Sequence, residues 1–216
     1  MTTAQTNSPL LPASVQQRWE VPDLFLRSAD AAWNRTRWEQ LPPDGNRYEV
    51  IDGVLYVSTA PSFFHQWIIR QIVRVLFAQI DDTHIGITLW APLGVFMPGC
   101  DPVQPDVVVL RQDDLAIIHD RRINGVPALL IEVLSPSNAE LDTTVKRAAY
   151  ARAGVPEYWI VRPEQRDVIV CSQPDLNLGN YTQSDHVPPD GTLVSPTLPV
   201  QVAIATFFAD APDTTL

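Results

Sequence analysis

Lysine is almost absent from this chain of 216 residues. Of the 15 basic residues, 14 are arginine and only Lys146 is lysine, against 25 acidic residues, so the formal net charge is -10. Proteins that hold nucleic acid through general charge usually carry a positive excess. The composition therefore excludes a charge-driven nucleic-acid binder, and any contact with a phosphate backbone must be local or assisted by a metal.

Cysteine and long apolar runs are scarce as well. The two cysteines, Cys100 and Cys171, lack CxxC spacing, which favours buried free thiols in a reducing compartment over a disulfide. No apolar run approaches the roughly 18 residues of a membrane-spanning helix. The first residues lack a basic stretch followed by an apolar one, so no secretory signal is expected. We therefore expect a cytoplasmic protein with no membrane segment.

Hydrophobic patterning predicts an α/β (α+β) fold with one domain. Residues 1–25 are polar and without period, which predicts a loose segment, and 26–210 are expected to form a single domain with a central mixed β-sheet flanked by helices. Ser28 is a candidate cap for a short helix that runs to Pro42. Two β-rich runs flank Asp52-Gly53 and predict an N-terminal β-hairpin.

The rest of the chain alternates between apolar runs and helical patterns. The nearly unbroken run over 128–134 predicts a strand that is covered on both faces. The other predicted elements are a long helix over 61–81, strands over 87–91, 94–97 and 106–110, a helix over 142–153 ended by Gly154, strands over 157–161 and 167–171, and a short terminal helix over 202–209.

Two acids and the lone lysine stand out by their placement. Asp106 opens an apolar strand, Glu132 lies inside the run ALLIEVL, and Lys146 lies on the following helix. A carboxylate among apolar side chains is costly unless it is paired or binds a cation. Mg²⁺ is commonly held by one or two carboxylates with waters and a substrate phosphate. The carboxylates of Asp106 and Glu132 and the carbonyl of Val133 are therefore candidate ligands.

Simpler interpretations of these residues remain open. Glu132 at an outward strand end, or in a structural salt bridge, would explain its position without chemistry. Asp142 and Lys146 are four residues apart and share a helix face, so Asp142 either holds the Lys146 ammonium in place or forms an ordinary surface pair worth about 0.3–0.5 kcal/mol. Tyr150, one turn further, is expected to pack in the core.

Several stretches together resemble the Uma family of endonucleases, which belongs to the PD-(D/E)XK restriction-endonuclease-like superfamily. They are RYEVIDGVLYV, PSFFHQ, VQPDVVVL, LLIEVLSPS, DTTVK and YARAGVPEYWIV, in order over roughly residues 38–209. The resemblance implies a restriction-endonuclease-like core and a Mg²⁺-dependent phosphodiesterase, with Mn²⁺ as substitute.

The resemblance assigns Pro105-Asp106 to the PD element and Glu132 to the acidic position of the (D/E)XK element. The lysine position of that element holds Leu134, and the resemblance implies that Lys146 takes its role from the next helix. It also implies a catalytic role for Glu49, which in related nucleases joins the metal site through water. His65 is a candidate for contact with substrate or with a metal ligand, or else a histidine packed at a helix end.

Three functions are compatible with these features. The first is a Mg²⁺-dependent endonuclease acting on nucleic acid, DNA foremost, with Lys146 assisting the attacking water; fold analogy alone adds a homodimer, because cutting two strands takes two sites. The second is a catalytically inactive nucleic-acid-associated or regulatory module of the same fold. The third is a partner-binding protein whose hairpin and Trp-rich N-terminus form an interface. No GxSxG turn supports acyl transfer.

Overall fold

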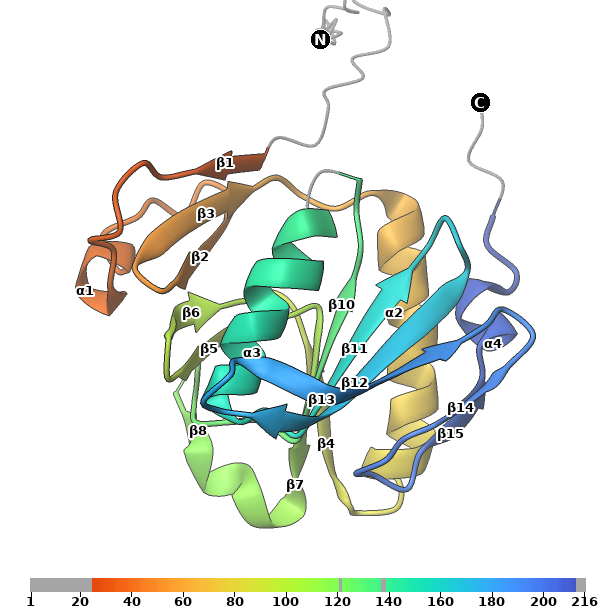
Figure 1. Cartoon of the computed structure of the whole chain (residues 1–216). Coiled ribbons are helices and arrows are strands. Elements are labelled where there is room, and N and C mark those ends of the chain that lie inside the picture. The colour runs from red at the N-terminus through yellow and green to blue at the C-terminus, as the bar shows by residue number, and fades with distance from the viewer. Residues whose placement is uncertain (1–24, 121, 137–138, 213–216) are drawn as a thin grey trace, which may run out of the picture.

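The computed structural model describes residues 25–120, 122–136 and 139–212. It confirms the mixed α/β fold class, with helices on the faces of a central sheet (Figure 1). The prediction of one sheet was wrong in number, because the described strands form sheets of six, seven and two strands. The predicted loose segment lies outside the described residues up to position 24, and the domain limits of 26–210 stay a prediction.

The six-stranded sheet is the centre of the fold. Its order is β13-β12-β11-β10-β7-β4, and only the pair β10 and β11 is parallel among the described strands of this sheet. All residues of β10 are buried, and its apolar side chains pack on both faces of the sheet, as predicted for a covered strand. The strands are β4 Gly86–Trp90, β7 Val107–Arg111, β10 Leu129–Val133, β11 Glu157–Arg162, β12 Asp167–Asp175 and β13 Asn180–Val187.

Two helices cover opposite faces of this sheet (Figure 1). Because side chains alternate along a strand, Val107 and Val109 of β7 pack in the cluster with α2, whereas Val108 and Leu110 pack in the cluster with α3. The helix predicted over 61–81 is confirmed, with Ser62 as its N-cap. The helices are α2 Phe63–Leu76, continued by the π-helical η2 Phe77–Asp81, and the π-helical η4 Leu141–Lys146, continued by α3 Arg147–Ala153 and ended by Gly154.

The predicted N-terminal hairpin is part of the seven-stranded sheet, whose order is β1-β3-β2-β6-β5-β9-β8. Asp52 and Gly53 both have positive φ, at +48° and +78°, as a tight two-residue hairpin turn requires. The strands are β1 Phe25–Arg27, β2 Arg47–Ile51, β3 Val54–Ser58, β5 Gly94–Met97, β6 Cys100–Val103, β8 Ile118–His119 and β9 Arg122–Asn124. The sequence pattern missed β1, β6, β8 and β9, which have two to four residues each.

The helix predicted from Ser28 to Pro42 is mostly absent. Only α1, Arg35–Trp38, is helical, and its cap is Asn34. Ser28 follows β1 and extends the pairing with β3, because its backbone and hydroxyl both exchange hydrogen bonds with the backbone of Leu55. A serine that continues a sheet edge cannot cap a helix, so the capping interpretation was wrong.

The terminal helix is also shorter than predicted. Residues 202 and 203 belong to β15, which pairs with β14, and only α4 over 205–208 is helical. Val202 stands opposite Leu193 in this pair, and strand pairing therefore overrides the helical pattern. The remaining elements are β14 Thr192–Val194, β15 Gln201–Ala203, α4 Ala205–Phe208 and the 3₁₀ helix η3 Gln112–Ile117.

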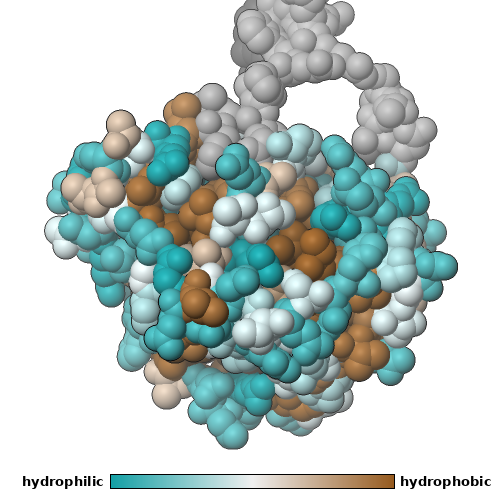
Figure 2. Space-filling view, in the orientation of Figure 1, coloured by the Kyte–Doolittle hydropathy of each residue, from teal (hydrophilic) through white to brown (hydrophobic). Residues whose placement is uncertain are grey.

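The prediction of buried free thiols is confirmed. Cys100 and Cys171 are free and buried. Figure 2 shows a face on which hydrophilic residues predominate and hydrophobic ones form separate patches. None of the helices in the described part of the chain combines the length and the apolarity that a bilayer crossing requires.

Candidate functional site

The site begins with two carboxylates on neighbouring strands. Asp106 immediately precedes β7, and Glu132 lies in β10, which pairs with β7 in antiparallel fashion. The Val133 N–H donates to Asp106 Oδ2 over 2.9 Å. This bond ties the Asp106 carboxylate to the backbone directly after Glu132, at the end of β10.

Two side chains from other elements hold the Asp106 carboxylate. Arg47, at the start of β2, donates from Nη2 to Asp106 Oδ1 over 2.9 Å. His65, in the first turn of α2, has its Nε2 3.1 Å from Asp106 Oδ2 and 2.8 Å from the carbonyl oxygen of Val133. A carbonyl oxygen can only accept, so His65 Nε2 carries a proton here.

The lone lysine lies between three carboxylates, that of Glu132 and two further ones. Lys146 Nζ is 2.9 Å from Glu132 Oε1 and 3.1 Å from both Glu49 Oε1 and Asp142 Oδ1. All four residues, like Asp106, are between 1 and 4% exposed. The interpretation of Asp142 and Lys146 as a surface pair is therefore wrong, because the ammonium is fully enclosed.

Two tyrosines and one glutamine fix this buried cluster. The Tyr150 hydroxyl donates to Glu132 Oε1 over 2.9 Å, so Tyr150 does more than the core packing expected of it. The Tyr158 hydroxyl donates to the Asp142 carbonyl over 3.0 Å, and the two tyrosine rings meet edge to face. The Gln104 N–H donates to Glu49 Oε1 over 2.8 Å. The carboxylates of Glu132 and Glu49 are thereby oriented by a partner besides the ammonium, whereas Tyr158 fixes the backbone of Asp142.

Burial and neighbouring charges shift the pKa values in opposite directions. Burial raises the pKa of Glu132 well above its ordinary value and that of Asp142 to about 6, and Lys146 offsets only part of either shift. Burial also favours neutral Asp106, but Arg47, His65 and the Val133 N–H outweigh it and hold the Asp106 pKa well below its ordinary value. For Lys146, burial is outweighed by the three carboxylates, which raise its pKa.

The chemistry of this donor set fits a divalent cation. Four carboxylates, those of Glu49, Asp106, Glu132 and Asp142, face two permanent cations, Arg47 and Lys146, so full ionisation leaves two negative charges in excess. Within the described residues, no three His, Cys, Asp or Glu side chains form a ready-made metal site. Mg²⁺ does not require one, because a backbone carbonyl and waters complete its usual coordination.

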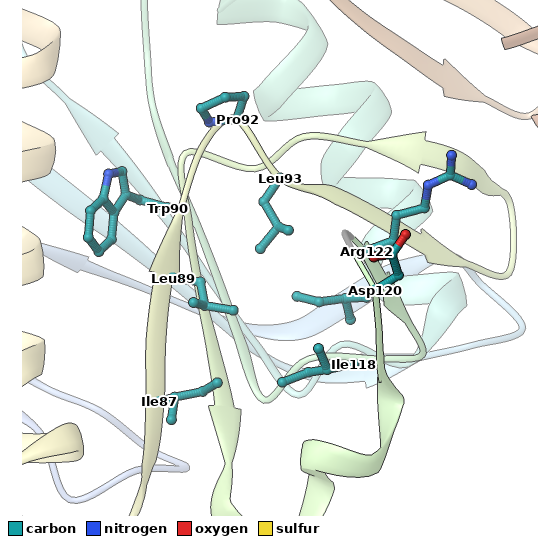
Figure 3. A pocket seen from close by; sticks show the side chains of 9 residues that line it. Ile87, Leu89, Trp90, Pro92, Leu93, Ile118, Asp120 and Arg122 are labelled. Atoms are coloured by element: carbon teal, nitrogen blue, oxygen red, sulfur yellow. The ribbon is translucent and has the colours of Figure 1, made fainter. Parts of the chain in front are cut away.

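Two openings to the surface are lined by residues that contact Asp106. A groove of about 190 Å³ includes Arg47 and Gln104, and a pocket of about 370 Å³ includes His65 and Ser135. A third cavity, of about 380 Å³, lies between β4 and β8, and Figure 3 shows Leu89, Leu93 and Ile118 pointing into it. Its lining is apolar apart from Asp120 and Arg122 at one side, so it offers no comparable set of reactive groups.

The site residues predicted from sequence lie together. Lys146 contacts Glu132, Glu49 and Asp142, and Asp106 contacts His65 and the backbone of Val133. The peptide bond between Glu132 and Val133 joins the two sets, while the chemical roles of these residues stay predictions. The sequence reasoning missed Arg47. It expected Tyr150 in the core, where Tyr150 lies, and did not foresee the hydrogen bond of its hydroxyl to Glu132. Both had a signal: Arg47 is two residues before Glu49 on a strand, and Tyr150 is four after Lys146 on a helix, so each pair shares a face.

Comparison with known proteins bears on the fold and on the family. A crystal structure described as "a putative nuclease belonging to DUF820", from Anabaena variabilis ATCC 29413, matches with a TM-score of 0.70 at 18% identity, over 82% of this chain and 97% of that one. At this identity the match shows a shared fold. No curated protein matches the chain. The sequence model of the Uma2 family matches residues 35–206, and the chain therefore belongs to that family, described as "Putative restriction endonuclease".

Proposed function

We propose that this protein is a nuclease that hydrolyses phosphodiester bonds of nucleic acid, DNA foremost, with Mg²⁺ as cofactor and Mn²⁺ as substitute. The family description supports a nuclease. The observation that carries the proposal is the buried contact of Lys146 with Glu132, beside an Asp106 carboxylate tied to the same strand end. Burying several acids around an ammonium costs free energy of desolvation, which favours a functional role for the cluster.

Asp106, Glu132 and the Val133 carbonyl are the groups that would hold the cation. All are oxygen donors, as Mg²⁺ prefers. When bound, the cation polarises the phosphodiester and lowers the pKa of a bound water. Val133 O and Asp106 Oδ2 both approach His65 Nε2, so the histidine marks the place where these two oxygens converge.

The role of Lys146 in the proposal is to orient the attacking water or to balance charge that develops on the phosphate. Glu49 and Asp142 hold the ammonium from two sides, at 3.1 Å each. Its raised pKa keeps Lys146 charged at neutral pH, which favours electrostatic stabilisation over proton abstraction from water. Glu49 and Asp142 are then positioning residues.

The test is nicking of supercoiled plasmid DNA by the purified protein with Mg²⁺, Mn²⁺ or EDTA. We expect nicking with either metal, none with EDTA, and loss of nicking in Asp106→Ala and Glu132→Gln. Asp113→Asn, on the exposed helix η3, is the matched control and keeps full activity. Equal nicking by the wild type and both site variants contradicts the proposal.

A second candidate is a nucleic-acid-binding module that does not cleave. One observation favours it: every charged group of the cluster except Arg47 is almost fully buried and already paired. Binding of DNA without nicking under any metal condition selects this function.

The homodimer belongs to the proposal as well. Cutting both strands of a duplex takes two sites, and light scattering of the pure protein measures the mass directly. A mass of twice 24.1 kDa supports the dimer, and a monomer at all concentrations contradicts it.

A further inference from the structure

The groove beside Asp106 has an unusual charge for this chain. It lies between the start of β2, the segment that leads into α2 and the residues after β4. Arg47 is the one charged side chain among its described lining residues, and none of them is acidic, in a protein of net charge -10. The lining residues are Gly45, Asn46, Arg47, Thr59, Ala60, Pro61, Gln66, Ala91, Pro92 and Gln104. Polar amides and one cation are suited to an anion.

Arg47 is held so that it can serve both the cluster and the groove. Its side chain is 17% exposed, and within the described residues its side chain makes one hydrogen bond, from Nη2 to Asp106 Oδ1. A guanidinium has five N–H donors in a fixed fork, so most of them remain for a ligand. The planar group suits a phosphate, which accepts two parallel hydrogen bonds.

The N-terminal end of helix α2 lies beside the groove. Pro61 precedes its N-cap, Ser62, and Gln66 lies in its second turn, so the groove opens at the N-terminal end of a 14-residue helix. The first turn of α2 contains no acidic residue. The helix dipole favours an anion at this end. The donors in the groove are side chains, because Pro61 has no N–H and the Gln66 N–H donates to the Ser62 carbonyl.

From this arrangement we infer that the groove is a phosphate subsite, which takes a backbone phosphate of the nucleic acid next to the one that is cleaved. The inference rests on the proposed function and adds to it the path of the substrate strand past Arg47. The ligand is a phosphate diester, held by the guanidinium and by the amides of Asn46 and Gln66. The apolar cavity of Figure 3 lacks such donors apart from Arg122.

The test measures DNA binding without cleavage. Fluorescence anisotropy of a fluorescein-labelled DNA duplex in EDTA gives the affinity and its salt dependence. Gln66→Glu places a negative charge at the groove and leaves the buried cluster intact; we expect affinity to fall about tenfold. Gln112→Glu makes the same charge change at the opposite end of β7 and should alter affinity less than about twofold. Arg47→Gln should lower the salt slope by about one.

Three results overturn the inference. They are the absence of measurable DNA binding by the wild type, an equal loss of affinity in Gln66→Glu and Gln112→Glu, and calorimetric binding of inorganic phosphate with no binding of DNA. The binding assay runs without metal and is therefore independent of cleavage. A wild type that never nicks plasmid refutes the nuclease, and the affinity measurements still test the phosphate subsite. Nicking with unchanged affinity in Gln66→Glu refutes the groove alone.

Discussion

Lys146 Nζ lies 2.9 Å from Glu132 Oε1, although 14 residues separate them and they belong to a helical turn and a strand. The resemblance to (D/E)XK nucleases would place the lysine at position 134, where this chain has leucine. The helix that packs on the sheet brings an ammonium to the acid from another direction. The contact is therefore made by tertiary structure, and local spacing in the sequence does not reveal it.

Removing the ammonium should destabilise the protein and end nicking. Lys146→Met leaves Glu49, Glu132 and Asp142 buried without their cation, and we expect a loss of about 3–5 kcal/mol in the free energy of unfolding. Lys146→Arg keeps the charge, but a planar fork cannot place one nitrogen near three oxygens, so we expect a folded protein with at least about tenfold less nicking. Urea unfolding and plasmid nicking measure both effects.

Arg147→Met is the matched control for Lys146→Met, because it removes one positive charge from the next, partly exposed position. It should stay within about 0.5 kcal/mol of the wild type. Equal effects of the two substitutions would mean that Lys146 has no special place.

Tyr150→Phe tests the orientation of Glu132. The variant loses the hydroxyl that donates to Glu132 Oε1 and keeps the ring that packs on Tyr158. A buried acceptor left with one partner fewer should cost about 1–3 kcal/mol of stability. Nicking should fall while Tyr158→Phe, which loses only a bond to a backbone carbonyl, retains more activity. The ratio of the two activities is the measurement, and a lower activity for Tyr158→Phe speaks against the assignment.

The raised pKa of Asp142 predicts a stability that falls as pH rises. Its ordinary value is 3.8 and burial, partly offset by Lys146, raises it to about 6, so the folded state keeps a proton that the unfolded chain has lost between these values. Folding therefore loses stability through this window, by at most about 3 kcal/mol for this group. Asparagine cannot ionise, so it does not lose stability in this way. The free energy of unfolding of Asp142→Asn should therefore rise relative to that of the wild type between about pH 4 and about pH 6. Urea unfolding in the absence of metal measures the difference, and parallel curves for the two proteins refute the shift.

Gly53 is predicted to set the position of β2. Its φ is +78°, and a Cβ at this position would collide with the backbone carbonyl of Ala31. Gly53→Ala should cost about 1–3 kcal/mol and lower nicking, because β2 carries Arg47 and Glu49 into the site. Gly45 has a similar φ of +89° but open space around it. Gly45→Ala should therefore lose less stability than Gly53→Ala, and the difference between the two is the cost of the collision. Thermal unfolding of both variants decides this, and equal midpoints contradict it.

Much of the fold was predictable because its signals are local. The hairpin at Asp52-Gly53, the helix over 61–81 and the covered strand with Glu132 follow from turn chemistry and periodicity, and all three are confirmed. The failures at Ser28 and Val202 have one cause. Strand pairing overrode a plausible helical pattern, with β3 for Ser28 and with the neighbouring β14 for Val202, and the helical period of a segment does not reveal such pairing.

The sequence predicted most residues of the site but fewer of the contacts between them. An acid in an apolar strand and a lone lysine are visible anomalies, because burial of charge is costly wherever it occurs. That Arg47 reaches Asp106 across 59 residues depends on where the seven-stranded sheet meets the six-stranded one. Spacing in the sequence does not predict where the two sheets meet.

The most direct test of the account is a crystal of this protein soaked in Mn²⁺, with anomalous scattering recorded to locate the ion. The account predicts a manganese peak bound by Asp106, Glu132 and the Val133 carbonyl, with the Lys146 ammonium beside them. Crystals that hold manganese only elsewhere, or show these groups unchanged at saturating metal, contradict it.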